Sequence, residues 1–250
     1  MTAAHHSAAD LSEVVLRPVR GHHAFEACVE QLATAIRLGV FALGSTLPNE
    51  RELADRLGVS RATLREAMAA LREAGLVKTN RGRAGGTVVT LQPTSPSSRT
   101  TARVSAHQAE DWLDALDYRR IIEPGAAALL AQQDLSADSR SQLLKAHAMV
   151  AGAKTRAKHR QADSLFHLTI ASLSGSARVV EAVTGVQASL HEMLSAIPVL
   201  SKNIDHSDRQ HADILNAVLD HDPARARRVM EEHCDDTAAL LRGLLLKGTP

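Results

Sequence analysis

Aromatic residues are scarce in this chain of 250 residues. Phe, Trp and Tyr together make up 2% of it, whereas apolar residues as a group reach 44%. The hydrophobic cores must therefore be built from Ala, Leu, Val and Ile, which favours packed helices over a β-sandwich. The length is sufficient for two domains with separate cores.

Cysteines and long apolar runs are also few. Cys28 and Cys234 lie far apart and match no metal-site spacing, which excludes a disulfide framework and predicts free thiols in a reducing compartment. No uncharged apolar run approaches the ~18 residues that a membrane span needs, and the N-terminus lacks the apolar region of a signal peptide. We therefore expect a soluble, cytoplasmic protein.

Residues 47–75 have the order of signals expected of two helices joined by a tight turn. Asn49 can cap a helix that runs to about Leu57, and Gly58 ends it. Ser60 can cap a second helix, which runs to about Glu73 and is followed by Gly75. In this second helix one face is an apolar stripe and the other is polar, the stripe being Leu64, Met68 and Leu71 and the polar face Arg61, Thr63 and Arg65. This layout is typical of a recognition helix that enters the major groove of DNA.

Two short apolar runs follow the second helix, at residues 76–79 and 87–91, on either side of a glycine-rich segment. They predict a two-stranded hairpin with a cationic tip, and hence a winged helix-turn-helix. Residues 51–83 hold eight cations against four anions, although the formal net charge of the whole chain is only +1. An arginine-rich solvated helix face is the alternative reading, but the order of caps, turn and wing favours binding to phosphates.

The rest of the chain divides by composition. Residues 1–21 have no periodicity and predict a flexible N-terminal arm, and residues 22–91 form the winged domain, whose first helix covers about residues 24–39. Residues 92–105 contain two prolines and predict a linker. Residues 106–250 have helical periodicity throughout, which predicts an antiparallel α-helical bundle with helices at about 109–123, 124–133, 136–153, 158–174, 176–197, 205–220 and 223–246. Pro124 and Pro223 are expected in first turns.

Four side chains in the predicted bundle form a candidate metal site. Asp163 and His167 are four residues apart on one helix, so they share a face and could chelate one ion. An isolated Asp/His pair at this spacing, however, usually forms a hydrogen bond on the helix surface. His211 and His233 lie at similar distances on either side of a turn between two helices, which would bring them level. One carboxylate and three imidazoles suit zinc best, and also nickel or manganese. Four further histidines are expected to be solvated, namely His147, His159, His206 and His221.

Two stretches resemble a known family. The segment LPNERELADRLGVSRATLREAMAALREAGLV, followed by RGRAGG, resembles the GntR superfamily of bacterial transcription regulators. That resemblance implies DNA contacts by residues of both helices and of the wing, namely Arg51, Arg61, Thr63, Arg65, Arg81, Arg83, Gly85 and Gly86. The family usually has Ser where this chain has Asn49, and both residue types cap helices.

The pattern of Arg119, Glu123 and the four candidate ligands resembles the FCD-type ligand domain of the FadR-like branch of that superfamily. The resemblance implies that Asp163, His167, His211 and His233 bind a divalent metal and that a small carboxylate effector completes its coordination. Arg119 is the candidate for a second contact to that effector, because a guanidinium matches a carboxylate at two points. An intrahelical pair with Glu123 is the alternative role for Arg119.

These observations predict a homodimeric transcription regulator, a repressor, that binds a near-palindromic double-stranded operator and responds to the effector. Two other functions remain open at this point. One is a metal-dependent enzyme with a DNA-tethering head, although no general base or nucleophile is identifiable near the ligands in sequence, so we expect no enzyme. The other is an architectural DNA-binding protein without an effector.

Overall fold

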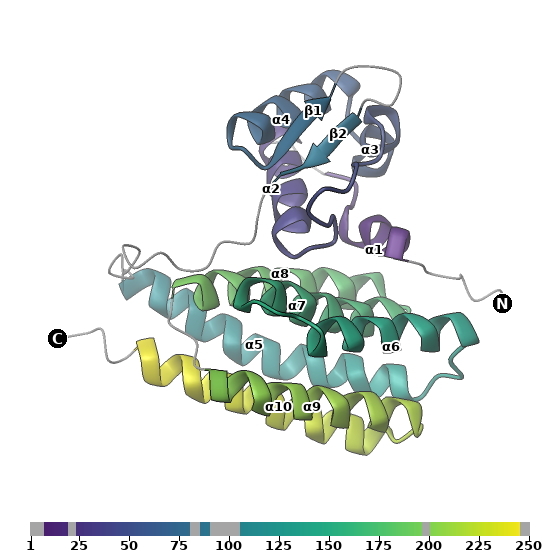
Figure 1. Cartoon of the computed structure of the whole chain (residues 1–250), viewed down its shortest axis with the longest axis vertical. Coiled ribbons are helices and arrows are strands. Elements are labelled where there is room, and N and C mark those ends of the chain that lie inside the picture. Colours follow the sequence, from purple (N-terminus) through teal and green to yellow (C-terminus); the bar gives the residue numbers. More distant parts are fainter. Residues whose placement is uncertain (1–7, 20–23, 81–85, 91–105, 197–200, 246–250) are drawn as a thin grey trace. The chain divides into compact units, whose positions relative to one another are not determined.

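The computed structural model describes residues 8–19, 24–80, 86–90, 106–196 and 201–245 (Figure 1). These residues belong to two compact units, one within residues 8–93 and the other within residues 94–250. Both are built mainly from helices, and the only sheet in the described part of the chain has two strands, which confirms the predicted fold class. Among the described residues there is no helix with the length and apolar character needed to cross a membrane.

The N-terminal unit contains a winged helix-turn-helix. Its elements are α2 (Ala24–Arg37), α3 (Glu50–Leu57), α4 (Arg61–Glu73), β1 (Val77–Asn80) and β2 (Gly86–Val89). The strands are antiparallel, with Val77 opposite Val89, and Thr46 adds an isolated bridge to Val88. The core is aliphatic, as the composition predicted, and includes Leu32, Ile36, Leu53, Leu57, Leu64 and Leu71.

The predicted helix signals of this unit are confirmed. The Asn49 side chain accepts a hydrogen bond from the Glu52 amide at 3.0 Å, and Gly58 ends α3 in the left-handed region with φ of 64°. The Ser60 hydroxyl accepts from the Thr63 amide, also at 3.0 Å. These contacts satisfy amides that a helix N-terminus leaves without partners, so local sequence suffices to position α4.

The N-terminal residues correct one expectation, because the described part of the predicted flexible arm is ordered. Residues 8–15 form a helix, α1 (Ala8–Val15), and Leu16, directly after it, is buried. Arg56 of α3 donates to Ser12 at 2.8 Å and pairs with Glu13 at 3.1 Å. The apolar run at residues 14–16 is too short to show a helical period, but packing against the winged unit orders it.

Leu16→Ala is expected to lower the unfolding free energy of the winged unit by about 2–5 kcal/mol, because the deleted atoms leave a cavity in the core. Hydrogen exchange of protected amides in α2 and α4, in the full chain, measures this change. Leu43→Ala is the control, since Leu43 is 48% exposed whereas Leu16 is 2% exposed. Equal protection in both variants would show that the Leu16 side chain contributes nothing to the stability of this unit.

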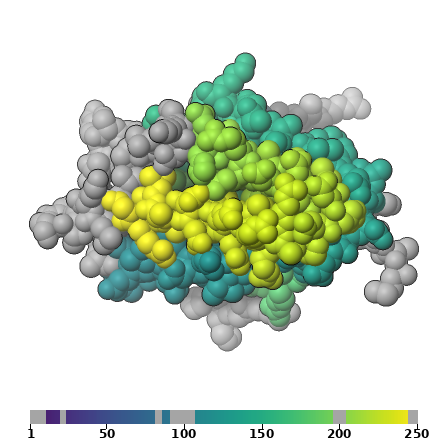
Figure 2. Space-filling view, turned by 90° about the horizontal axis from the view of Figure 1, so that it is seen from below, coloured from purple at the N-terminus to yellow at the C-terminus, as the bar shows by residue number. Residues whose placement is uncertain are grey.

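The C-terminal unit is a helical bundle. Its helices are α5 (Ala106–Ala131), α6 (Ala137–Ala151), α7 (Arg156–Leu173), α8 (Ala177–Ala196), α9 (Ser201–Leu219) and α10 (Pro223–Leu245). On one face of this unit α10 runs between α9 and α5 (Figure 2). The larger core cluster includes Leu130, Phe166, Ile170, Ile214, Val218 and Met230, and a smaller one gathers around Trp112, Leu116, Leu190 and Leu241.

Pro124 corrects a second expectation. The two helices predicted at residues 109–123 and 124–133 are one continuous helix, α5, with Pro124 inside it. Proline removes a backbone hydrogen bond and costs about 3 kcal/mol in a helix interior. Here Ala126, Ala127 and Leu130 are buried beyond the proline, so packing of α5 against its neighbours outweighs that cost. Pro223, in contrast, begins α10 as predicted.

Candidate functional site

The second helix of the winged unit presents a polar, basic face. Leu64, Met68 and Leu71 are buried, as predicted, whereas Arg61 and Arg65 are exposed. Thr63 is half-buried, and its hydroxyl lies 2.8 Å from the Ser60 hydroxyl, so it also takes part in the cap. The helix that begins at Arg61 is therefore not packed inward along its basic side.

Two exposed arginines of this unit, Arg65 and Arg51, lie in ion pairs on the surface. Arg65 donates to Glu50 at 2.8 Å, and Arg51 lies 3.9 Å from Asp55. Exposed ion pairs of this kind contribute about 0–1 kcal/mol, so phosphates can compete for both guanidinium groups. The predicted wing residues Arg81, Arg83 and Gly85 lie outside the described residues. Gly86 begins β2, where a Cβ atom would lie 2.8 Å from the Thr46 methyl group.

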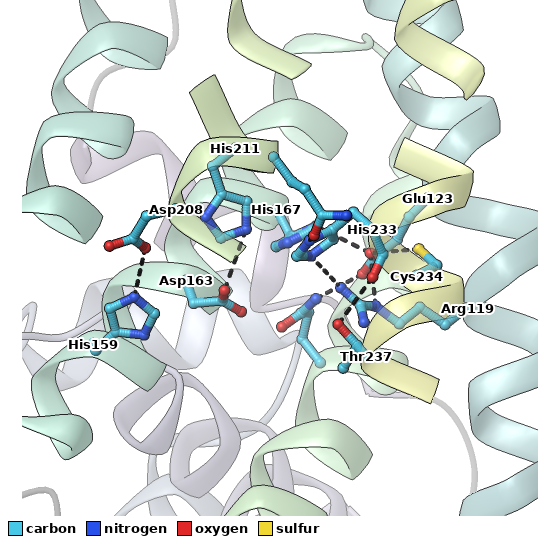
Figure 3. A network of polar contacts seen from close by, with 12 residues as sticks. Arg119, Glu123, His159, Asp163, His167, Asp208, His211, His233, Cys234 and Thr237 are labelled. Atoms are coloured by element: carbon cyan, nitrogen blue, oxygen red, sulfur yellow. Dashed lines mark hydrogen bonds and ion pairs between the residues drawn. The ribbon is translucent and has the colours of Figure 1, made fainter. Parts of the chain in front are cut away.

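In the helical unit, four of the predicted site residues come together. Asp163 and His167 of α7, His211 of α9 and His233 of α10 each offer one ligand atom, and these atoms all lie within 4.8 Å of one another (Figure 3). All three imidazoles are at most 2% exposed. One ion could therefore contact all four residues.

Two histidines of this cluster, His211 and His233, are in the protonation state that metals require. Burial lowers the pKa of His211 to about 3, and burial also holds the pKa of His233 well below its usual value. Both are therefore neutral at pH 7, and neutral imidazole is the form that binds a metal. The Nε2 atom of His211 lies 3.3 Å from Asp163 without the alignment of a hydrogen bond. A buried ring nitrogen that lies beside a carboxylate and has no hydrogen-bond partner among the described residues fits a cation site.

The contacts of His233 fix the position of its proton. Its Nε2 lies 3.0 Å from Nη2 of Arg119, and a guanidinium only donates, so Nε2 accepts. The proton is therefore on Nδ1, which lies 3.2 Å from the side-chain oxygen of Gln210. The amide nitrogen of Gln210 donates in turn to Asp236 at 2.7 Å. Such contacts orient a ligand histidine from outside the coordination sphere.

Glu123 is a buried carboxylate that contacts both Arg119 and His167. It accepts from Arg119 Nε at 2.8 Å and from Gln187 at 2.6 Å, and it lies 3.0 Å from Nδ1 of His167. Burial alone would raise the pKa of Glu123, but the charge of Arg119 and the contact with His167 hold it well below its usual range. A charged Glu123 favours a proton on Nδ1 of His167, which leaves the Nε2 lone pair for an ion.

Arg119 makes the intrahelical pair with Glu123 that the sequence offered as its alternative role. Its Nε pairs with Glu123, yet its buried Nη1 atom has no hydrogen-bond partner among the described residues. Burial opposes the charge on this guanidinium, but Glu123 outweighs burial and raises its pKa above the usual value. Arg119 is therefore a fixed cation with donor capacity to spare.

A cavity adjoins the cluster. It contains about 590 Å³ of space, part of it open to solvent, and Arg119, Asp163 and His233 line it together with residues of α8 and α9. His159 also lines it and corrects an expectation, because it is buried and lies 2.8 Å from Asp208 instead of being solvated. The partners Gln187 and Gln210 were missed in the sequence, since neither lies near a ligand in a recognisable motif.

The geometry can be compared with known proteins. Residues 25–89 match the family described as bacterial regulatory proteins, gntR family, and residues 114–236 match the FCD domain. The Glc operon transcriptional activator of Escherichia coli (strain K12) is 30% identical over 89% of this chain and 91% of its own length. The HTH-type transcriptional repressor NanR of Klebsiella aerogenes is 29% identical over 98% of this chain and 97% of its own. Among solved structures, E. coli McbR/YncC has a similar fold, with a TM-score of 0.53 and 18% identity over 89% of this chain and 99% of that one.

Proposed function

Because this chain belongs to the GntR family of DNA-binding transcription regulators and carries an FCD domain, we propose that its helical unit senses a small carboxylate through a bound divalent metal. The matching families and relatives are transcription regulators and not enzymes. We further propose that the protein is a repressor, as the name of the related NanR protein states for that protein.

The observation that carries this proposal is the buried cluster beside a cavity, which Asp163 and His233 of the cluster line. Three imidazoles and Asp163 form a donor set that suits zinc, and also nickel or manganese, when their ligand atoms are this close. Such an ion supplies a Lewis-acid centre with coordination positions left for an anionic oxygen. Arg119 lines the same cavity and has one nitrogen without a partner in the part of the chain that the structure describes, so it can hold a carboxylate from a second direction.

Arg119 also couples metal and effector. Its Nη2 uses the lone pair of His233 Nε2, and one imidazole nitrogen has one lone pair. Arg119 therefore gives up this contact when His233 holds an ion. The guanidinium then has two nitrogens, Nη1 and Nη2, for the effector carboxylate, while Nε keeps its pair with Glu123. Metal binding should thus favour effector binding, and the reverse must hold by linkage.

The winged unit supplies the DNA contacts in this proposal. Arg61, Thr63 and Arg65 on α4, with Arg51 on α3, face the major groove, and the wing residues Arg81, Arg83, Gly85 and Gly86 approach the minor groove. A homodimer doubles these contacts and matches a near-palindromic operator. The effector regulates only to the extent that it binds the DNA-competent and DNA-incompetent states unequally.

The test is a gel shift of the zinc-loaded protein, at a stated salt concentration, on double-stranded DNA from upstream of its own coding region. We expect a sequence-specific shift that a saturating small carboxylate weakens, and we expect His167→Ala to bind the same DNA without responding to the acid. A carboxylate that leaves the wild-type shift unchanged, at concentrations where calorimetry shows it bound, would disprove the regulatory link.

Arg61→Ala and Arg65→Ala are each expected to weaken specific DNA binding by about 1–3 kcal/mol if these side chains contact base edges. Competition gel shifts against a scrambled duplex measure the specific part of the affinity. Lys145→Ala, which removes an exposed cation of the helical unit, is the control and should bind as the wild type does. Unchanged affinity in both arginine variants would remove α4 from the recognition surface.

A further inference from the structure

The cavity beside the cluster of Asp163, His167, His211 and His233 is polar at the cluster and more apolar farther from it. On α7 the lining residues Asp163, Arg160 and Arg156 follow one another at about one-turn intervals, and on α10 His233, Thr237 and Leu240 do the same. The cavity therefore extends about 10 Å along these helices from the cluster. Because the cavity extends this far, a ligand whose carboxylate is bound at the cluster must place the rest of its carbon chain against the lining beyond Thr237.

The wall beyond the cluster is mainly apolar. Leu190 and Leu194 of α8, Ile204 of α9 and Leu240 of α10 all line it. Leu190 belongs to the smaller core cluster and Leu194 packs against it, so this wall is continuous with a hydrophobic core. A ligand whose carbon chain packs against these four side chains gains affinity, because its apolar surface is removed from water. The four side chains offer it no hydrogen-bond donor or acceptor.

Ser207 adds one hydroxyl to the lining, but most other polar groups along the same wall are already engaged. The Thr237 hydroxyl donates to the His233 carbonyl at 2.9 Å, and His159 lies 2.8 Å from Asp208. Arg160 interacts with another residue of the protein, and Arg156 is exposed in the first turn of α7, where solvent screens its charge. Hydroxyl groups along a ligand's chain would therefore lose their hydration and gain little in return.

We infer that the effector is a monocarboxylate with an apolar chain, as opposed to a sugar acid or a dicarboxylate. This inference rests on the proposed function, since the carboxylate end is placed at the metal cluster and Arg119. Each methylene that moves from water to the apolar wall should raise the affinity about fourfold. Chain length and hydroxylation, and not acidity, then set which acids the protein senses.

The experiment is calorimetric titration of the zinc-loaded full chain with acetate and with three acids of six carbons: hexanoate, gluconate and adipate. Hexanoate is expected to bind at least tenfold more tightly than each of the other three. Leu194→Asn should reduce hexanoate affinity at least tenfold and leave acetate affinity unchanged. Leu144→Asn, at a 48% exposed position on α6, is the matched control and should bind hexanoate as the wild type does.

The outcomes separate this inference from the function on which it rests. Tighter binding of gluconate or adipate than of hexanoate would overturn the apolar class but keep a carboxylate sensor. Hexanoate binding that survives Leu194→Asn would also overturn it, because the wall would then not contact the chain. Failure of all four acids to bind the zinc-loaded protein would overturn the proposed function itself.

Discussion

Zinc added to metal-free protein, at 1,000 times its dissociation constant, is expected to raise the unfolding free energy of the helical unit by about 4 kcal/mol. The reason is that Asp163, His167, His211 and His233 converge only in the folded state, so the ion binds that state preferentially. Hydrogen exchange of protected amides in α7 and α10, with zinc or with a chelator, measures the difference in the full chain.

His211→Ala should abolish most of this stabilisation, because it removes one ligand of four and weakens the site. His107→Ala is the matched control, since the His107 side chain is 85% exposed and lies outside the cluster. Zinc should stabilise that variant as much as the wild type. If zinc leaves the wild-type helical unit unchanged, or stabilises His211→Ala equally, the four residues are not a metal site and the sensing part of the proposal fails with them.

The features that sequence predicted best are those that depend on near neighbours. Asn49 and Ser60 each bond to an amide three residues later, so their positions suffice to locate the starts of α3 and α4. Pro124 shows the opposite case, because its place inside α5 depends on packing against other helices and not on the residues beside it. The same is true of Leu16, whose burial depends on the rest of the winged unit.

In the candidate site, too, some residues could be predicted from local spacing and others depend on tertiary packing. Asp163 and His167 share a helix face, and the turn at residues 220–223 aligns His211 with His233, so spacing predicted that these four residues come together. Their supporting contacts are different, because Gln187 lies 64 residues from Glu123 and Gln210 lies 23 from His233. Only the packing of the helices brings these two side-chain amides to the site, so no local sequence pattern could predict them.

Arg119→Met is expected to lower the unfolding free energy of the helical unit by about 3–5 kcal/mol, measured with a chelator present so that metal occupancy does not change. The substitution keeps most of the side-chain volume but leaves Glu123, 1% exposed, without the cation that offsets its burial. Gln187 alone cannot replace that charge. The neighbouring Arg120→Met is the control, because Arg120 pairs with Asp235 on the surface and its loss should matter far less.

The double variant Arg119→Met, Glu123→Leu distinguishes a lost ion pair from lost packing. If the cost of the single variant comes from an uncompensated buried carboxylate, removing that carboxylate should restore much of the stability, since apolar replacement of a whole buried pair is often neutral. Hydrogen exchange of α5 and α7 amides compares the wild type, Arg119→Met, Glu123→Leu and the double variant. A double variant no more stable than Arg119→Met would show that the guanidinium stabilises the bundle through its packing. Arg119 would then be a structural residue whose pairing with Glu123 is incidental.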